Sequence, residues 1–320
     1  MLCGYNQAAY IQAAVASALA QTHANLELIV IDNGSTDGSP ELLRPYQSDP
    51  RVRLLLHPSN DAVTKRLNEA IRLSSGEYIS LLYGDDYYLP QKLERQLEAF
   101  AGLTPDYGVV YSPNYRLDDA TGTKWIDKTL KCSGAILREM FVRHDEEGFI
   151  NPISPLLRRE CFERCRYHED VFMEGESILL RIAVTYKFHY LDEPLTVMRE
   201  HANNVGKAIK LNAESAMVLI GKLPAEPDFP PELMPDLNAF RGRLLGVWGW
   251  LGIRMAADPV WARKCFLSAI RLQPQQLLRP RTLGGLALSL LPASGVRLFN
   301  HGMNAMRDHK ENVVFRPDYN

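Results

Sequence analysis

The chain has 320 residues and a formal net charge of −2, and 46% of its residues are hydrophobic while 23% are charged. This is the composition of a globular protein, and the length suits one large domain with a helical appendage, or two domains. No apolar run reaches the ~18 residues of a membrane span, and Met1 leads into a polar turn, which predicts no signal peptide.

Buried strands alternate with helices along the first part of the chain. We predict strands at 1–3, 26–31, 52–56, 78–82 and 107–112, and helices at 10–20, 40–46, 62–74 and 91–101. Such alternation forms an α/β fold with a mostly parallel sheet flanked by helices. No Gly-x-Gly-x-x-Gly follows the first strand and no Walker A loop occurs, so the sequence does not favour a dinucleotide-binding domain.

An acidic turn follows the expected strand at 78–82, whose apolar run suits a strand covered on both faces. Because ligands bind outside the carboxyl ends of strands in an open α/β sheet, Asp85 and Asp86 lie where a ligand is expected. Adjacent carboxylates repel each other unless a cation or hydrogen bonds offset the charge. A divalent metal that carries a phosphate suits them. The alternative is a turn that only caps the helix beginning near Pro90.

Four short stretches carry a more specific signal. They are Gly4–Gln7 with Ser17, Gln21 and Thr22; Val30–Gly38; Leu67 and Asn68 with Gly76–Ile79; and Gly84–Asp86. In this order and spacing they resemble the family 2 glycosyltransferases of the GT-A fold, over residues 1 to about 205. The resemblance implies a Rossmann-like GT-A fold and a nucleotide-diphospho-sugar donor.

The resemblance also implies a donor site. Tyr5 would lie beside the nucleotide base, and Asn33, next to Asp32, would read the base edge, since an amide can both donate and accept. Lys65 or Arg66 would neutralise the diphosphate, although both also suit a solvated helix face. The implied nucleotide-sugar-binding residues are Tyr5, Asp32, Asn33, Lys65, Arg66, Asn68, Gly84, Asp85, Asp86 and His201.

The metal motif of the family is Asp-x-Asp. Here Tyr83 stands at the first Asp position and Asp85 at the second, which usually ligates the metal that bridges the two phosphates. The resemblance therefore implies a Mn²⁺ or Mg²⁺ ion held by Asp85, with Asp86 in support. His201 lies in a segment that resembles the Arg-x-His of many relatives and would contact the diphosphate or the metal, the alternative being a structural histidine.

A carboxylate before the helix predicted near residue 178 would act as the general base. In inverting relatives an Asp takes the proton of the acceptor hydroxyl as the sugar–phosphate bond breaks. That position is Gly175 here, and it is flanked by Glu174 and Glu176. We favour Glu174 over Glu176 as the base; the alternative is that both only cap the helix, since acidic side chains suit the first turn.

The predicted function is that of an inverting glycosyltransferase that moves a sugar to a hydroxyl acceptor, in cell-envelope polysaccharide or lipid-linked glycan synthesis. One rival is a nucleotidyltransferase of similar fold, although the expected Gly-rich basic loop is absent at residues 4–9. The other rival is a non-catalytic GT-A-like protein that binds a nucleotide or glycan. Tyr83, Gly175 and the short first strand support this second rival.

The last part of the chain differs in character. We predict a catalytic domain at 1–212, a Pro-rich linker at 213–236 and a helical region at 237–320. Between Arg241 and Arg307 lie ten of the 36 Lys and Arg residues but one of the 38 Asp and Glu residues. This region would contact an anionic membrane surface rather than nucleic acid, or pack on the catalytic domain or a second subunit. The five cysteines lack metal-ligand spacing, so we expect reduced thiols and a cytoplasmic protein, peripheral on the inner membrane face.

Overall fold

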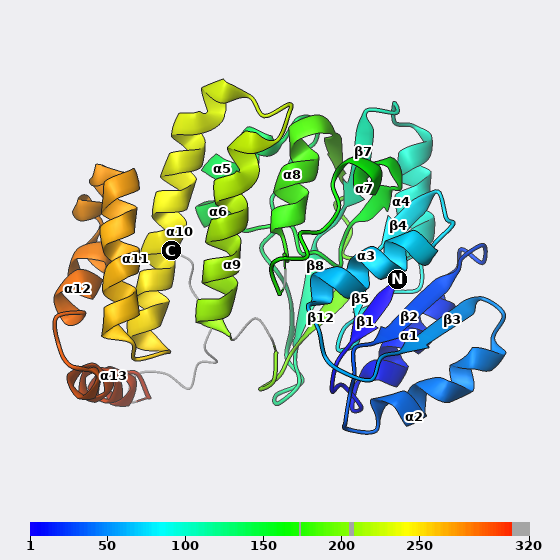
Figure 1. Cartoon of the computed structure of the whole chain (residues 1–320), viewed down its shortest axis with the longest axis horizontal. Helices are drawn as coiled ribbons and strands as arrows, with labels where there is room; N and C mark the ends of the chain where they lie inside the picture. Colours follow the sequence, from blue (N-terminus) through cyan, green and yellow to red (C-terminus); the bar gives the residue numbers. More distant parts are fainter. Residues whose placement is uncertain (173, 205–207, 309–320) are drawn as a thin grey trace. The chain divides into compact units, whose positions relative to one another are not determined.

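The computed structural model describes residues 1–172, 174–204 and 208–308 and divides into two compact units (Figure 1). The first unit comprises Met1–Asn204 and Ala225–Phe229, and the second comprises Val205–Pro224 and Pro230–Asn320. These boundaries differ from the predicted division at 212 and 236, because the chain returns to the first unit for five residues. Residues 309–320 of the predicted helical region lie outside the described residues.

A parallel sheet forms the amino-terminal half of the first unit. Its order is β3 (Val52–Leu56), β2 (Leu28–Asp32), β1 (Leu2–Gly4) and β5 (Leu82–Tyr83), with all neighbours parallel. On β2, Leu28 and Val30 pack in the cluster that includes helices α1 (Ile11–Leu19) and α2 (Ser39–Leu43). Ile29 and Ile31 face the opposite way, toward α3 (Val63–Leu73). Because alternate residues of a strand face opposite sides, the run is buried on both faces, as predicted.

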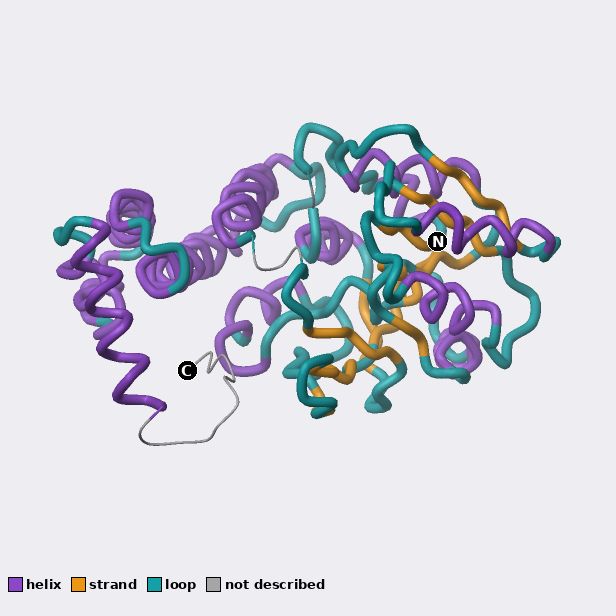
Figure 2. Tube along the Cα trace, turned by 90° about the horizontal axis from the view of Figure 1, so that it is seen from below, coloured by secondary structure: helices purple, strands orange, loops and turns teal. Residues whose placement is uncertain are grey.

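Two further sheets complete the first unit. One has the order β11 (Lys187–Tyr190), β7 (Tyr107–Tyr111), β10 (Leu156–Arg158) and β4 (Tyr78–Ser80), and the other has the order β6 (Tyr87–Tyr88), β12 (Thr196–Glu200), β8 (Asn114–Asp118) and β9 (Lys124–Ile126). The remaining helices are α4 (Lys92–Ala101), α5 (Leu137–Val142), α6 (His144–Glu147), α7 (Glu160–Arg164) and α8 (Ser177–Thr185). Figure 2 shows the strands grouped together, with helices beside them.

The prediction of one strand at 78–82 was wrong. The chain forms two short strands here, and they pair in different sheets: β4 is antiparallel to β10, while β5 is parallel to β1. The hydrophobic pattern could not reveal this, because Ile79, Leu81 and Leu82 are all buried whichever neighbour they pair with. The change of partner at Leu81 places the acidic turn at the carboxyl end of the parallel sheet.

The second unit is helical. Its helices are α9 (Ile209–Lys222), α10 (Met234–Arg254), α11 (Pro259–Leu272), α12 (Pro280–Leu288) and α13 (Ala293–Asp308). Helix α9 occupies much of the predicted linker. On α10, a Cβ at Gly249 or Gly252 would press on the rings of Phe266 or Trp261, so glycine lets α10 and α11 approach closely. No helix among the described residues is long and apolar enough to cross a membrane.

The five returning residues are tied to the first unit by ion pairs. The guanidinium of Arg181 on α8 donates from Nε to Glu226 Oε1 at 2.7 Å. Arg164 lies 3.6 Å from Asp228. Residues 225–229 therefore act as a strap across α7 and α8, which we call the 225–229 strap.

Candidate functional site

The loops that follow β1 and β2 are bonded to each other at the carboxyl end of the parallel sheet. The backbone amide of Asn6 donates to Ser35 Oγ at 2.8 Å, and the amide of Ala8 donates to Asp37 Oδ2 at 2.8 Å. In return, the amide of Thr36 donates to Asn6 Oδ1 at 2.8 Å. These bonds fix the loop that carries Tyr5, whose side chain is exposed.

Gly84 brings the acidic turn against the end of β1. A Cβ at this position would collide with the side chains of Gln7 and Ile11, and the backbone of Gly4 is immediately adjacent. Its amide donates to the carbonyl of Cys3 at 3.1 Å. Gly84 therefore allows close packing of backbone on backbone and sets the position of the next residue, Asp85.

Asp85 and His201 lie next to each other, although they are 116 positions apart in the chain. The imidazole Nε2 of His201 lies 3.2 Å from Asp85 Oδ2, and the side chains are only 10% and 13% exposed. The ring of Tyr10, at the start of α1, stacks on the His201 ring at a centroid distance of 4.7 Å. Tyr10 therefore limits the orientations that the imidazole can take.

Arg199 supports the same cluster from β12. Its guanidinium donates to Asp119 Oδ1 at 3.0 Å and lies over the rings of Tyr10 and Tyr87, at 5.5 and 5.1 Å. Tyr10 also hydrogen-bonds to Asp119, and its pKa is raised by burial and by this bond. Arg199 and Asp119 thus both support the Tyr10 ring, which stacks on His201.

Asp86 has different surroundings from Asp85. Its Oδ1 accepts from the backbone amide of Arg199 at 2.9 Å, and the residue is buried. Burial, and then the neighbouring Asp85, raise the pKa of Asp86 well above its usual range. Asp86 thus joins the acidic turn to β12.

The Asp85–His201 pair is suited to a divalent metal that arrives with a phosphate ligand. Among the described residues, no group of three or more His, Cys, Asp and Glu side chains could hold a metal ion by itself. Mg²⁺ and Mn²⁺, however, are often held by one or two protein ligands together with substrate phosphates. One carboxylate oxygen and one imidazole nitrogen fit that pattern.

Asn33 uses its whole amide within the protein. Its Nδ2 donates to Asn60 Oδ1 and to the Asp61 carbonyl, both at 2.8 Å. Its Oδ1 accepts from the Asp61 amide at 3.2 Å and from Arg66 Nε at 2.8 Å. Two donors and two acceptor positions are therefore occupied. Asn33 holds the loop at 59–61 in place, and reading a base edge would require breaking one of these bonds.

The two predicted cations on α3 point to different partners. Arg66 is mostly buried and joins Asn33 to Glu69, which lies 3.7 Å from its guanidinium. Lys65 is half-exposed and pairs with Asp61 at 3.1 Å. Asp32, beside Asn33, is buried and accepts from the amide of Ser35 at 2.9 Å.

Asn68 binds the chain that precedes α8. Its Nδ2 donates to the carbonyl of Tyr167 at 2.9 Å and to Glu169 Oε1 at 2.8 Å, while its Oδ1 accepts from the Tyr167 amide at 3.0 Å. Thr64 Oγ1, one turn earlier on α3, donates to the carbonyl of Val171 at 2.8 Å. The geometry gives Asn68 a structural role in docking 167–172 on α3.

An Asn68→Ala variant is expected to release this docked segment. The loss of three hydrogen bonds around a buried amide costs about 1–3 kcal/mol of local stability, since the backbone groups of Tyr167 lose their partners. Hydrogen exchange at the Tyr167 amide should accelerate by at least about tenfold. Unchanged exchange at Tyr167 would contradict this role. Asn25→Ala, on the loop before β2, is the matched control.

Glu174 was favoured as the base, but its carboxylate is occupied by structural bonds. Its side chain is 0% exposed; Oε1 accepts from Arg181 Nη1 at 3.0 Å and Oε2 from the His168 amide at 2.8 Å. Arg181 in turn pairs with Glu226 of the 225–229 strap. Glu174 therefore closes the loop between 168 and α8.

Glu176 is open to solvent where Glu174 is not. It occupies the N-cap position of α8 but makes no side-chain capping bond, so helix capping does not explain it. The surrounding protein still desolvates the carboxylate, and this desolvation raises its pKa. Asp127 adds to the rise, whereas His144 and Arg116 oppose it. Glu176 is thus an accessible carboxylate with a raised pKa, as a general base requires.

Arg116 connects the two acidic ends of the site. Its guanidinium forms ion pairs with Asp127 and with Glu200. It also lowers the pKa of both Asp86 and Glu176, so it lies within electrostatic reach of each.

Sequence reasoning missed Arg116 together with Tyr10 and Asp119. Their only signal was an isolated charge or ring in a loop or strand, without a motif around it.

The comparisons with known proteins identify the family and the fold. Residues 1–166, just over half of the chain, match the family model described as Glycosyl transferase family 2. The putative teichuronic acid biosynthesis glycosyltransferase TuaG of Bacillus subtilis is 36% identical over 95 residues, which are 29% of this chain and 38% of that protein. The chain spans less than half of the length of the curated relatives that it matches first, at 47%, 17% and 38%.

Solved structures show a similar fold at low sequence identity. S. aureus TarS 1–349 in complex with UDP-GlcNAc has a TM-score of 0.66 and 13% identity, covering 99% of this chain and 93% of that chain. The mannosyltransferase PcManGT from Pyrobaculum calidifontis, in complex with GDP-Man and Mn²⁺, has a TM-score of 0.57 and 16% identity, covering 94% and 86%. These matches confirm the predicted GT-A fold. With the family match over residues 1–166, they show that the chain belongs to glycosyl transferase family 2.

Proposed function

We propose that the protein is a metal-dependent, inverting glycosyltransferase that moves a sugar from a nucleotide-diphosphate donor to a hydroxyl acceptor. The observation that carries the proposal is the Asp85–His201 pair at the carboxyl end of the parallel sheet, 3.2 Å apart and held by Tyr10. Membership of glycosyl transferase family 2 supports the reaction class. The UDP-GlcNAc of TarS and the GDP-Man and Mn²⁺ of PcManGT support the donor class and the metal.

Asp85 and His201 would hold the metal, while Asp86 would stay bonded to β12. A divalent cation at this position stabilises the negative charge that develops on a departing diphosphate. The proposed donor surface is lined by Tyr5, Asp32 and the loop that Asn33 and Arg66 hold at 59–61. Lys65 keeps a proposed role near the phosphates, since its pair with Asp61 is half-exposed and easily exchanged.

Glu176 is the proposed general base. The acceptor oxygen forms a bond to the anomeric carbon as the bond from that carbon to the diphosphate oxygen breaks. The acceptor proton passes to Glu176, and the bonding electrons leave with the diphosphate. Attack from the face opposite the leaving group inverts the anomeric centre. Glu174 serves instead as the support that holds the loop of Glu176 closed.

We propose a cell-envelope polysaccharide or a lipid-linked glycan as the acceptor, and work at the cytoplasmic face of a membrane. The similarity to a protein named for teichuronic acid biosynthesis supports an envelope polymer. The excess of Lys and Arg between Arg241 and Arg307 supports an anionic surface as partner.

Thermal unfolding against a panel of nucleoside diphosphates, with and without Mn²⁺, tests the proposal. A ligand that binds only the native state raises the melting temperature by mass action. We expect one nucleotide to raise it only when Mn²⁺ is present, and Asp85→Ala to remove that effect. No shift with any nucleotide would favour a non-catalytic binding protein, to which Tyr83 and Gly175 at the family's two Asp positions also point. A shift in melting temperature without sugar transfer from the matching sugar nucleotide would also favour a non-catalytic binding protein.

A further inference from the structure

Helix α11 exposes a stripe in which apolar and basic residues alternate. Val260, Lys264, Leu267 and Arg271 recur at helical spacing, and all four are exposed. The opposite side of α11 is buried and includes Trp261, Ala262 and Phe266. The helix therefore has, besides its buried face, a mixed apolar and basic stripe that the described residues of the second unit do not cover.

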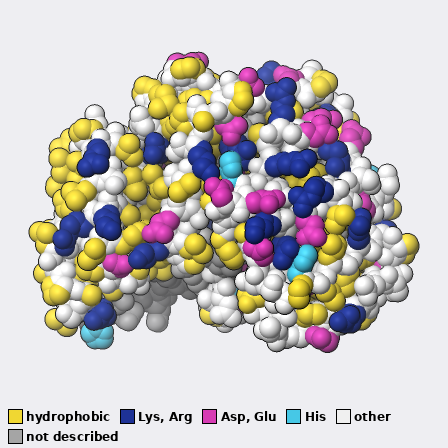
Figure 3. All heavy atoms as spheres, viewed as in Figure 1, with side chains coloured by type: hydrophobic (Ala, Val, Ile, Leu, Met, Phe, Trp, Pro, Cys, Tyr) yellow, Lys and Arg dark blue, Asp and Glu magenta, His cyan; other side chains and the backbone are white. Residues whose placement is uncertain are grey.

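The chain after α11 exposes further leucines, and one of them, Leu290, lines a recess together with Val260. Leu278, just before α12, is 81% exposed; Leu283 on α12 is 50% exposed; and Leu290, in the turn after α12, is 71% exposed. Scattered exposed leucines are ordinary on a protein surface, but a contiguous apolar patch marks an interaction site. Figure 3 shows hydrophobic side chains gathered over α11 and α12, with Lys and Arg side chains among them.

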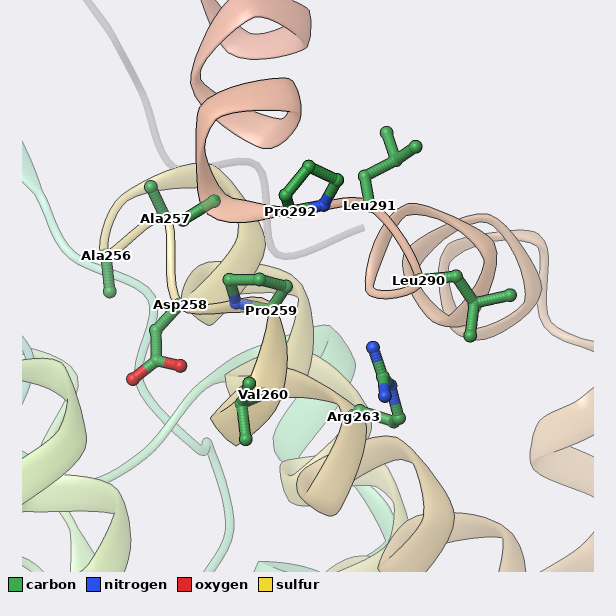
Figure 4. Close-up of a pocket in the computed structure, with 10 residues that line it drawn as sticks. Ala256, Ala257, Asp258, Pro259, Val260, Arg263, Leu290, Leu291 and Pro292 are labelled. Atoms are coloured by element: carbon green, nitrogen blue, oxygen red, sulfur yellow. The ribbon is translucent and has the colours of Figure 1, made fainter.

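Two recesses lie in this part of the second unit. One, of about 710 Å³, lies between the α10–α11 turn and the α12–α13 turn and is lined by Val260, Arg263, Leu290 and Leu291, among others. Figure 4 shows Arg263 beneath the turn that carries these two leucines. The other, of about 480 Å³, is lined by Trp250, Arg281, Ala287 and Phe299, among others. Each recess combines apolar walls with one arginine, and the first also includes Asp258.

The charges around this surface are predominantly positive; the carboxylate of Asp258, which lines the first recess, pairs with Lys210 at 2.9 Å. Residues 259–307 contain seven Lys and Arg residues and no Asp or Glu. Those with described side chains are Arg263, Lys264, Arg271, Arg279, Arg281 and Arg297. A partner must therefore provide an apolar phase that the leucines can enter and, directly beside it, negative charges that pair with the Lys and Arg side chains.

A second copy of the chain does not meet this demand through the same surface. A two-fold contact would place each face against itself, so two predominantly basic faces would meet. An anionic lipid bilayer offers both partners, since acyl chains lie just beneath a layer of phosphate groups. Long Arg and Lys side chains can reach those phosphates while the leucines enter the hydrocarbon.

We propose that the surface formed by α11, residues 273–279, α12 and the turn at 289–292 docks on an anionic lipid bilayer. We call this surface the α11–α12 face. The helices would lie along the membrane interface, with the exposed leucines inserted and the cations at the headgroups. This assignment rests on the part of the proposed function that places the protein at a membrane, and on no step of sugar transfer.

Cosedimentation of the full chain with vesicles tests the proposal. The vesicles contain phosphatidylcholine alone, or phosphatidylcholine with about a third phosphatidylglycerol. One triple variant removes apolar contacts, Leu267→Gln with Leu278→Gln and Leu290→Gln, and the other removes charge, Lys264→Gln with Arg271→Gln and Arg281→Gln. The matched controls outside the face are Leu211→Gln with Val218→Gln on α9, and Arg53→Gln on β3.

The wild type should bind anionic vesicles at least about tenfold more tightly than neutral ones, and added salt should weaken binding. Each triple variant should lose at least about tenfold in affinity for anionic vesicles, while the controls keep the wild-type value. Equal binding by wild type and triple variants would overturn the proposal. So would a dimer that light scattering detects in the wild type and that the triple variants lose, because the face would then join two copies.

The nucleotide-dependent rise in melting temperature is measured on the same variants. It should be unchanged in all of them, since none alters the proposed donor site. If a triple variant loses vesicle binding but keeps the nucleotide-dependent rise in melting temperature, the loss is due to the α11–α12 face and not to the donor site. A missing nucleotide response in the wild type would count against the proposed transfer reaction and leave the vesicle result to be judged separately.

Discussion

An Asp85→Asn variant transfers sugar from its nucleotide donor at least about a hundredfold more slowly than the wild type. The amide keeps the size of the side chain but removes the negative charge that would hold a divalent metal. It also weakens the contact with His201, now 3.2 Å from the carboxylate. The measurement is kcat/KM for the sugar nucleotide identified by thermal unfolding, at several Mn²⁺ concentrations. The apparent affinity for Mn²⁺ should fall together with the rate.

Asp49→Asn is the matched control for this variant. Asp49 precedes β3 and so lies at the amino end of the parallel sheet, where it pairs with Arg51 at 2.8 Å. Ligands of such sheets bind at the carboxyl ends, so this substitution should leave kcat/KM within about twofold of wild type. Full activity in Asp85→Asn, with the fold intact, would remove Asp85 from the proposed reaction.

A Glu176→Gln variant loses at least about a hundredfold in kcat but keeps its affinity for the donor nucleotide. The amide cannot accept the acceptor proton, while the donor surface at 32–61 is unchanged. Because desolvation by the surrounding protein raises the pKa of Glu176, and a base must be ionised, kcat/KM in the wild type should fall as the pH drops through that raised value. The midpoint of this acid limb should lie above the ~4.3 of an ordinary glutamate. This acid limb should be absent from the pH profile of Glu176→Gln.

Glu174→Gln provides the contrast that separates the two neighbouring carboxylates. Here the main loss is stability, by about 1–3 kcal/mol, because a buried carboxylate that binds Arg181 and the His168 amide is replaced. The cost stays below the 3–5 kcal/mol typical of a broken buried pair, because Arg181 keeps Glu226. The pH dependence of kcat/KM, measured for the Glu174→Gln protein that remains folded, should match that of the wild type. A normal melting temperature with abolished turnover would return Glu174 to the role of base.

Gly175 offers a further check on the loop. Its φ is 53°, a left-handed conformation that Asp tolerates better than most residues, and no atom lies within 4 Å of an added Cβ. Gly175→Asp in the Glu176→Gln background therefore restores a carboxylate to the loop at little steric cost. A partial return of kcat is expected. No return, in a folded protein, would show that the loop needs its carboxylate at Glu176 itself.

The strand ends could be predicted because their signals are local. Apolar runs and the turns after them gave the positions of β2 and β3, and the parallel sheet then placed Asp85 at its carboxyl end. His201 could be placed beside Asp85 only through the family resemblance, since 116 positions separate the two. The split of 78–82 between two sheets depends on pairing partners far along the chain, and no local pattern encodes that choice.

The roles of polar side chains could not be predicted from residue type. Asn33, Asn68 and Glu174 occupy positions that the resemblance assigns to binding or catalysis, yet their polar atoms are all bonded within the protein. An amide or carboxylate has the same chemistry whether it faces a ligand or a backbone. Only the surrounding atoms decide, and those come from distant segments such as Tyr167 and Asp61.

The 225–229 strap determines where the chain can be cut. A fragment that stops anywhere from 205 to 224 keeps every strand of the first unit but leaves Arg181 without Glu226 and Arg164 without Asp228. Arg181 also holds Glu174, so such a fragment would loosen the loop that presents Glu176. A gene fragment that encodes the reactive unit has to run through Phe229 and therefore carries α9 with it.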